Sequence, residues 1–187
     1  MAAPTPVSSL VHSSTLVTAG IYVLIRYHYL FDFLWMDFFK IFSIFTMVLA
    51  GIYASFEIDL KKVVAMSTLR QLGIILFVVS IGCWSLSFIH MAIHAFFKSM
   101  LFLGTGSLMG QVAGMQDSRF YGGNSVSYFS CVYFFSSCFC LRGFPFFVGF
   151  YSKDFIINSV SFVEGGILYL LFLLGCVFTV IYRARLV

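Results

Sequence analysis

Charged residues are scarce in this chain, and their scarcity excludes most classes of soluble protein. Only 10% of the 187 residues are charged, whereas 61% are hydrophobic; soluble domains average about 25% charged residues. Several apolar runs reach the roughly 20 residues that a helix needs to cross a bilayer. The formal net charge of +4 is small and dispersed, which argues against a nucleic-acid partner. The composition therefore indicates an integral membrane protein.

Motifs that hold metals or redox cofactors are also missing from the sequence. The five cysteines form no CxxC pair and no other spacing typical of a metal site. No glycine-rich nucleotide loop follows a predicted strand, and no cysteine cluster could hold an iron–sulfur centre. We therefore expect neither a metal nor a redox cofactor in this chain. Its 25 phenylalanines are typical of a T-rich genome such as a mitochondrial one.

Six apolar segments are present, and each is expected to be a membrane helix. Helices are the default in lipid because a lone strand cannot satisfy its backbone hydrogen bonds there. The segments run over residues 7–29, 38–56, 62–82, 86–110, from 126 with an interruption at 143–149, and 166–182. Their connections are short, so residues 1–187 are expected to form a single membrane domain. The predicted fold class is an all-α polytopic bundle of about six transmembrane helices, one of them broken.

The remaining charges divide between the two ends of these segments and predict the orientation of the chain. The basic side chains at one end are Lys61, Lys62, Arg119, Arg183 and Arg185. The charged side chains at the opposite end are Arg26, Lys40, Asp32, Asp37 and Glu164. Membrane proteins concentrate lysine and arginine on the cytoplasmic or matrix side, so we expect the first end there. An even number of spans places both chain ends on that same side.

The segment at 86–110 carries three ionisable side chains on one helix face. His90, His94 and Lys98 are four residues apart, so they stack on successive helical turns over about 12 Å. Ionisable groups inside a membrane are costly and commonly mark proton pathways, and histidine exchanges protons near neutral pH. The pattern favours a proton relay. The alternatives are polar groups satisfied by neighbouring helices and a metal site, although Met91 stands where zinc proteases have glutamate.

A helix-breaking sequence lies next to a lysine in the segment that begins at 126. Pro145 removes a backbone donor and kinks or breaks a helix, and Gly143 and Gly149 loosen the same stretch. Broken membrane helices expose backbone groups that transporters use as ion sites. This favours a functional role for Lys153, which has Asp154 beside it. The alternative is that Lys153 extends to the membrane edge.

Three further polar stretches carry expectations. His12 lies among six hydroxyl side chains within residues 8–18, which either bond to their own helix or hold water against the histidine. The charged turn at 57–62 predicts a solvated loop with Asp59 as a helix cap and with Lys62, rather than its neighbour, pointing inward. The sequence at 71–73 predicts a close contact between helices.

Taken together, these motifs resemble the antiporter-like chain 5 subunits of respiratory NADH:ubiquinone oxidoreductase (complex I). The resemblance rests on residues 4–20, 59–68, 90–98 and 149–154, which occur in the family's order. Subunits of sodium/proton antiporters share much of this pattern, so a cation/proton antiporter is the alternative. The family has a longer chain, and residues 1–187 resemble its central to C-terminal core. Arg70 stands where the family usually has a small polar residue.

The resemblance implies a proton-translocating subunit of an H⁺-pumping NADH:ubiquinone reductase, with no redox centre of its own. FMN, iron–sulfur clusters and ubiquinone are then bound by other subunits. The implied partners are other membrane-arm subunits including another antiporter-like one, the lipid bilayer, and the missing parts of the same subunit. The implied location is the mitochondrial inner membrane, with a bacterial plasma membrane as the alternative. The expected relay residues are His12, Lys62, His90, His94, Lys98, Lys153 and Asp154.

Overall fold

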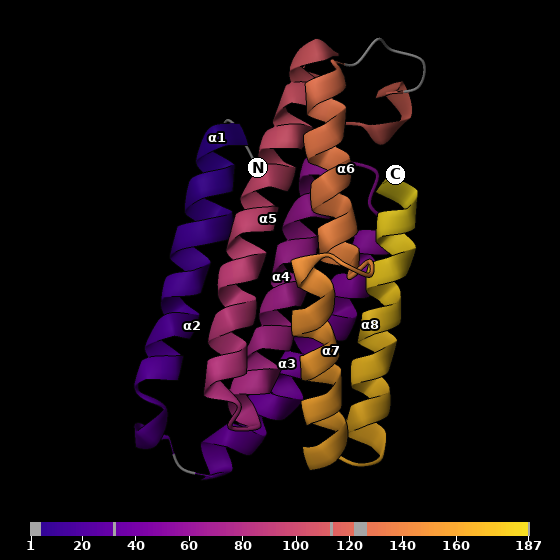
Figure 1. The fold of residues 1–187 in the computed structure, drawn as a ribbon. Helices are drawn as coiled ribbons and strands as arrows, with labels where there is room; N and C mark the ends of the chain where they lie inside the picture. Colours follow the sequence, from indigo (N-terminus) through magenta and orange to yellow (C-terminus); the bar gives the residue numbers. More distant parts are fainter. Residues whose placement is uncertain (1–4, 32, 113, 122–126, 187) are drawn as a thin grey trace.

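Every long apolar run of the sequence forms a helix, and the helices lie side by side in one bundle (Figure 1). The computed structural model describes residues 5–31, 33–112, 114–121 and 127–186, without the side chains of residues 12, 13, 33, 34, 183, 185 and 186. Within these residues the only β structure is an isolated bridge between Asp59 and Asp117. The prediction of an all-α membrane bundle is confirmed.

The first two spans are joined by a short turn at one end of the bundle. The first is a continuous helical run of α1 (Thr5–Val7), the π-helix η1 (Ser8–Thr15) and α2 (Leu16–Arg26). After a short 3-10 turn, η2 (His28–Leu30), the chain returns along α3 (Phe33–Phe56). At 1.5 Å per residue both runs are about 33 Å or longer, which matches the hydrocarbon core of a bilayer.

The third and fourth spans occupy the middle of the bundle. Helices α4 (Leu60–Ser80) and α5 (Trp84–Gln111) are joined by a tight turn in which Gly82 has φ +93°. A Cβ atom at Gly73 would lie 2.9 Å from the backbone oxygen of Ser43 in α3. This close approach confirms the predicted helix contact at 71–73. It also draws the polar side chains of α4 into the interior.

The fifth span is interrupted, as predicted. After the short helix η3 (Ser118–Tyr121), helix α6 (Tyr128–Arg142) runs to the middle of the bundle and ends there (Figure 1). Helix α7 (Val148–Val163) completes the crossing, and α8 (Ile167–Leu186) returns as the sixth span. Taken alone, α6 and α7 are each too short to cross a bilayer.

The two ends of the described chain lie at the same end of the bundle (Figure 1), as an even number of spans requires. The turn between α2 and α3 and the turn between α7 and α8 lie at the opposite end (Figure 1). The predicted division of charges therefore separates the two ends of the bundle. Asp32 lies outside the described residues, as do the side chains of Arg183 and Arg185.

Apolar contacts hold the broken span against the continuous ones. One buried cluster joins α3, α4, α7 and α8 and includes Met47, Phe77, Val160 and Phe172; the rings of Phe77 and Phe172 stack with centroids 5.4 Å apart. A second cluster joins α4, α5 and α6. The break between α6 and α7 thus lies between two packed regions.

Candidate functional site

The predicted row on α5 is buried inside the bundle. His90, His94 and Lys98 are 4%, 2% and 0% exposed. The Lys98 ammonium donates a hydrogen bond to the hydroxyl of Ser67 on α4. The row therefore faces a neighbouring helix rather than lipid, which both the relay interpretation and the purely structural one require.

Helix α4 presents a polar face that matches this row. Gln71 accepts at its Oε1 from His90 Nε2 over 3.2 Å, while Ser67 accepts from Lys98. Ser67 and Gln71 are four residues apart, so they lie on one face of α4. The two helices are antiparallel (Figure 1), so the serine meets the far end of the row and the glutamine its near end.

His90 connects three helices through its two ring nitrogens. Its Nδ1 lies 3.0 Å from the Ser152 hydroxyl on α7, opposite the contact with Gln71. Because a glutamine Oε1 only accepts, Nε2 carries a proton and Nδ1 of the neutral ring accepts from Ser152. When Nδ1 is protonated it donates to Ser152, whose own proton can then turn to the Gly149 carbonyl at 3.4 Å.

The end of α6 has the hydrogen bonds of a Schellman motif. Gly143 adopts the left-handed conformation with φ +79°, and its N–H donates to the Cys140 carbonyl over 3.1 Å. The Phe144 N–H donates to the Phe139 carbonyl over 3.2 Å. Glycine is favoured at the left-handed position and proline commonly follows such an end, so Gly143 and Pro145 together terminate α6.

Gly149 lets the start of α7 pass close to the end of α6. A Cβ atom at this position would overlap the carbonyl oxygen of Cys140. Between the two half-helices Phe146 has φ +74° although it is not glycine; residues other than glycine rarely adopt this conformation. The interruption is therefore a defined turn.

Lys153 belongs to this break and does not extend to the membrane edge. Its ammonium donates to the Leu141 carbonyl at the end of α6. The last carbonyls of a helix have no intrahelical partner and carry the negative end of its dipole. A cation on α7 is thus held by the freed backbone of α6.

A cavity of about 210 Å³ lies beside Lys153. Its wall includes Arg70 of α4, Arg142 at the end of α6, and Asp154 of α7. Arg70 is fully buried, with its guanidinium carbon 5.9 Å from the centre of the Tyr182 ring. Most of its wall is apolar, but these charged side chains border it, and its volume is enough for several water molecules. Asp154 itself is exposed at its edge, so its relay role stays a prediction.

The segment around His12 forms a π-helix that packs against α5. The backbone of His12 lies in this helix, but its side chain lies outside the described part of the structure. Ser14 and Thr15 donate to the Leu10 carbonyl over 2.8 and 3.0 Å, so these two hydroxyls bond to their own helix. π-Helical turns occur frequently at functional sites, but the relay role of His12 stays a prediction.

The expectation that Lys62 points inward is wrong. Its side chain is 55% exposed and pairs with Asp59 over 2.7 Å. Lys62 lies in the first turn of α4, where a nearby carboxylate and open solvent attract its ammonium. The Asp59 side chain makes this ion pair rather than a helix-capping hydrogen bond. The hydrogen bond from Lys62, together with Asp117, lowers the pKa of Asp59 below its usual value.

Sequence reasoning missed the partners that complete the site. The predicted row is contacted by Ser67 and Gln71 of α4 and by Ser152 of α7. The four-residue spacing of Ser67 and Gln71 was a usable signal, because it equals the spacing of the row itself. Ser152 offered no such signal, because its contact with His90 depends on how α7 is placed. Across the described residues, no group of three His, Cys, Asp or Glu side chains is arranged for a metal ion.

The fold and the site define a class of protein: polytopic helical membrane proteins with a buried row of ionisable groups and a broken helix. The chain belongs to the NADH:quinone oxidoreductase/Mrp antiporter transmembrane family, whose profile matches residues 1–179.

Animal relatives of this chain are similar over its entire length. The chain is 48% identical to NADH-ubiquinone oxidoreductase chain 5 of Apis mellifera ligustica and 46% identical to that of Anopheles quadrimaculatus. It is 45% identical to chain 5 of Mytilus edulis. All of this chain is covered in each comparison, but only 34%, 33% and 34% of the relatives. The chain thus spans about a third of the length of these proteins.

Two solved structures share the fold. A chain of the membrane-bound sulfane sulfur reductase, an archaeal respiratory membrane complex, superposes with a TM-score of 0.89 at 26% identity. This comparison covers 99% of the present chain and 39% of the other. A chain of the Mrp complex from Dietzia sp. superposes with a TM-score of 0.85 at 30% identity, over 98% and 21% of the two chains.

Proposed function

We propose that this chain is part of a proton-translocating membrane subunit of respiratory NADH:ubiquinone oxidoreductase. The observation that carries the proposal is the buried row on α5 with its partners: Lys98 donates to Ser67, and His90 contacts Gln71 and Ser152, the residue before Lys153. The similarity to chain 5 of several animals supports the particular complex. The expected location is the mitochondrial inner membrane, with both described ends on the matrix side.

In this proposal the two lysines are the sites that gain and lose a proton. Each ammonium has an acceptor, the Ser67 hydroxyl or the Leu141 carbonyl, and charge on a lysine is disfavoured by burial. His90 exchanges protons between them, because both of its ring nitrogens have hydrogen-bond partners. Water in the cavity beside Lys153 would carry the proton onward. Redox energy comes from cofactors that other subunits bind.

The first test asks which complex contains the chain. Native electrophoresis of mildly solubilised source membranes, with an NADH-oxidation stain and mass spectrometry, locates its peptides. We expect them in the NADH-oxidising band, together with peptides from the other two thirds of a chain 5 subunit. Migration in a separate band would contradict the proposal.

The second test concerns the lysines themselves. Lys98→Met and Lys153→Met should each lower the protons pumped per NADH severely, because methionine keeps the apolar bulk but carries no proton. Lys61→Met at the start of α4 is the control, and it should pump normally. The readout is acidification of inside-out membrane vesicles per NADH oxidised, at equal amounts of assembled complex. Normal stoichiometry in both variants would refute a relay through these residues.

A cation/proton antiporter is the alternative function, and the similarity to a chain of the Mrp complex favours it. It predicts sodium-dependent proton movement that continues without NADH. Proton movement that requires NADH and is unaffected by sodium would exclude this alternative.

A further inference from the structure

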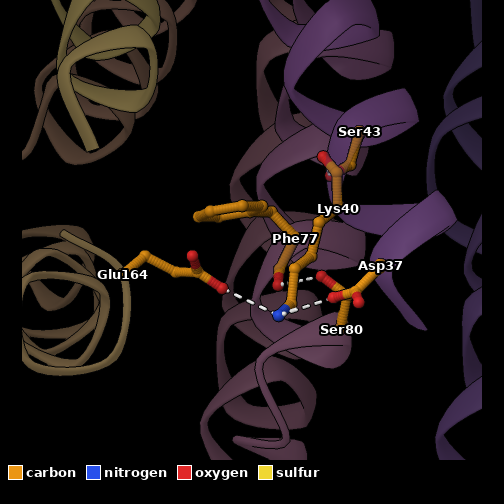
Figure 2. A network of polar contacts seen from close by, with 6 residues as sticks. All are labelled: Asp37, Lys40, Ser43, Phe77, Ser80 and Glu164. Atoms are coloured by element: carbon orange, nitrogen blue, oxygen red, sulfur yellow. Dashed lines mark hydrogen bonds and ion pairs between the residues drawn. The ribbon is translucent and has the colours of Figure 1, made fainter. Parts of the chain in front are cut away.

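A second charged cluster lies at the end of the bundle opposite the described chain ends, and the proposed relay does not use it. Lys40 of α3 lies between two carboxylates (Figure 2). Its Nζ is 2.8 Å from Glu164 Oε1 and 3.1 Å from Asp37 Oδ1. The two contacts differ in kind, because Asp37 belongs to α3 itself whereas Glu164 follows the last residue of α7.

The pair of Lys40 and Glu164 is largely withdrawn from solvent. Their side chains are only 16% and 14% exposed, compared with 45% for Asp37. Figure 2 shows Phe77 and Ser80 of α4 in the same view, and the Ser80 hydroxyl bonds to the Phe77 carbonyl of its own helix. An ion pair is screened much less when it is buried than at a surface, and losing one partner leaves the other charge uncompensated.

Glu164 has a specific need for this cation. It is the C-cap of α7, and its backbone N–H donates to the Val160 carbonyl over 2.9 Å. The C-terminus of a helix carries the negative end of its dipole, where a carboxylate is unfavourable. Lys40 compensates both the carboxylate and the helix end, and in doing so it connects α7 to α3.

The same half-helix carries Lys153 near its other end. From Lys153 to Glu164 the helix extends about 16 Å, so the two residues lie near opposite ends of one continuous helix. At its start, α7 is held by Ser152 against His90 and by Lys153 against the Leu141 carbonyl. The direction of α7 therefore depends on contacts at both ends.

We propose that Lys40 and Glu164 are positioning residues for Lys153. Their ion pair holds the far end of α7 on α3, so that the start of α7 presents Lys153 to the Leu141 carbonyl and the adjacent cavity. The proposal rests on the proposed function, because it assigns a consequence for proton pumping. It predicts that pumping depends on the ion pair between α3 and the end of α7, and not on the charge of Lys40 alone.

The test compares variants of the complete subunit in its native complex, by protons pumped per NADH oxidised in inside-out vesicles. Lys40→Met and Glu164→Gln should each lower this ratio toward the value measured for Lys153→Met, because a displaced Lys153 no longer meets the Leu141 carbonyl and the cavity. Lys40→Arg, which retains a cation of similar reach, should keep the ratio. Asp37→Asn is the matched control: it removes the contact within α3 and should leave pumping unchanged.

An exchange of the two charges supplies the decisive comparison. In the Asp37→Asn background, so that no acid faces the new carboxylate, Lys40→Glu with Glu164→Lys should restore the pumping that either change alone removes. The inference is overturned if the exchange fails to restore pumping at normal assembly. It is also overturned if Asp37→Asn lowers pumping equally, or if the single variants only reduce the amount of complex at an unchanged ratio. Lys98→Met and Lys153→Met measured alongside separate the two proposals. A normal ratio in both refutes the proposed relay. A low ratio in Lys153→Met with a normal ratio in Lys40→Met refutes only the positioning role.

Discussion

Lys98 and Lys153 lie in the same bundle, yet the fold holds their ammonium groups by different kinds of contact. Lys98 is fully buried on a continuous helix and donates to a side-chain hydroxyl on the neighbouring helix. Lys153 is half-buried and donates to a backbone carbonyl at the end of a broken helix. The first arrangement needs two closely packed helices, whereas the second needs a helix that stops.

This difference determines what surrounds each charge. Lys98 is 0% exposed, and Leu101 and Phe102, about one turn further along α5, are 2% and 1% exposed. The region around Lys153 contains a cavity of about 210 Å³. A lysine enclosed by side chains exchanges protons through its direct contacts, whereas a lysine beside a cavity bordered by charged side chains can exchange them with water. Ser152, which contacts His90 of the first region and precedes Lys153, joins the two.

The largest effect on stability is expected at Gly149, on which the close approach of α7 to the end of α6 beside Lys153 depends. In Gly149→Ala the new methyl group overlaps the Cys140 carbonyl, and overpacking against backbone costs about 3 kcal/mol or more. We expect less assembled subunit and a lower melting temperature. On heating, the break between α6 and α7 should unfold before the region around Lys98. Thermal unfolding of the solubilised complex and immunodetection of the subunit measure this.

The matched control for that variant is Gly165→Ala, between α7 and α8. A Cβ atom at Gly165 meets nothing within 4 Å, so stability should change by less than about 0.5 kcal/mol. Equal behaviour of the two alanine variants would contradict the view that the break depends on close approach at Gly149.

An intermediate effect is expected at the connection between the regions. Ser152→Ala removes a buried hydrogen bond to His90 Nδ1, and the loss of such a bond costs about 1 kcal/mol. We expect fewer protons pumped per NADH, with both lysines still present. Ser159→Ala is the control, because the Ser159 hydroxyl bonds to the Ile156 carbonyl of its own helix over 2.9 Å. Equal pumping in the two variants would show that the regions do not communicate through Ser152.

The smallest effect on stability is expected for Lys62, which lies outside both the packed region around Lys98 and the break beside Lys153. Lys62 pairs with Asp59 at the surface, and such pairs contribute little. Its hydrogen bond lowers the pKa of Asp59, so the pair stabilises the fold above the usual aspartate range and less as the pH falls through the lowered pKa. Asp59→Asn should therefore lower the melting temperature slightly at neutral pH and not at all in strong acid. A decrease that is equal at every pH would contradict this origin.

Features that depend on local sequence were predictable. The length of the apolar runs predicted the six spans. The four-residue spacing predicted the row of His90, His94 and Lys98, and Pro145 with its flanking glycines predicted the interruption. Each of these follows from backbone geometry and from the cost of exposing polar groups to lipid. The inward orientation of Lys62 was predicted wrongly. Residue spacing does not show whether the first turn of a helix is buried or exposed, nor that a carboxylate lies close enough to pair with the lysine.

The sequence by itself thus determined that the chain crosses a membrane as helices, which helix faces carry ionisable groups, and where one helix breaks. Only the tertiary structure decided which groups meet. Ser67 faces Lys98 because α4 and α5 are antiparallel and in register, and Leu141 accepts from Lys153 because the start of α7 lies against the end of α6. Glu164 meets Lys40 across the bundle for the same reason. Such contacts depend on the relative placement of whole helices, which many packed side chains set together.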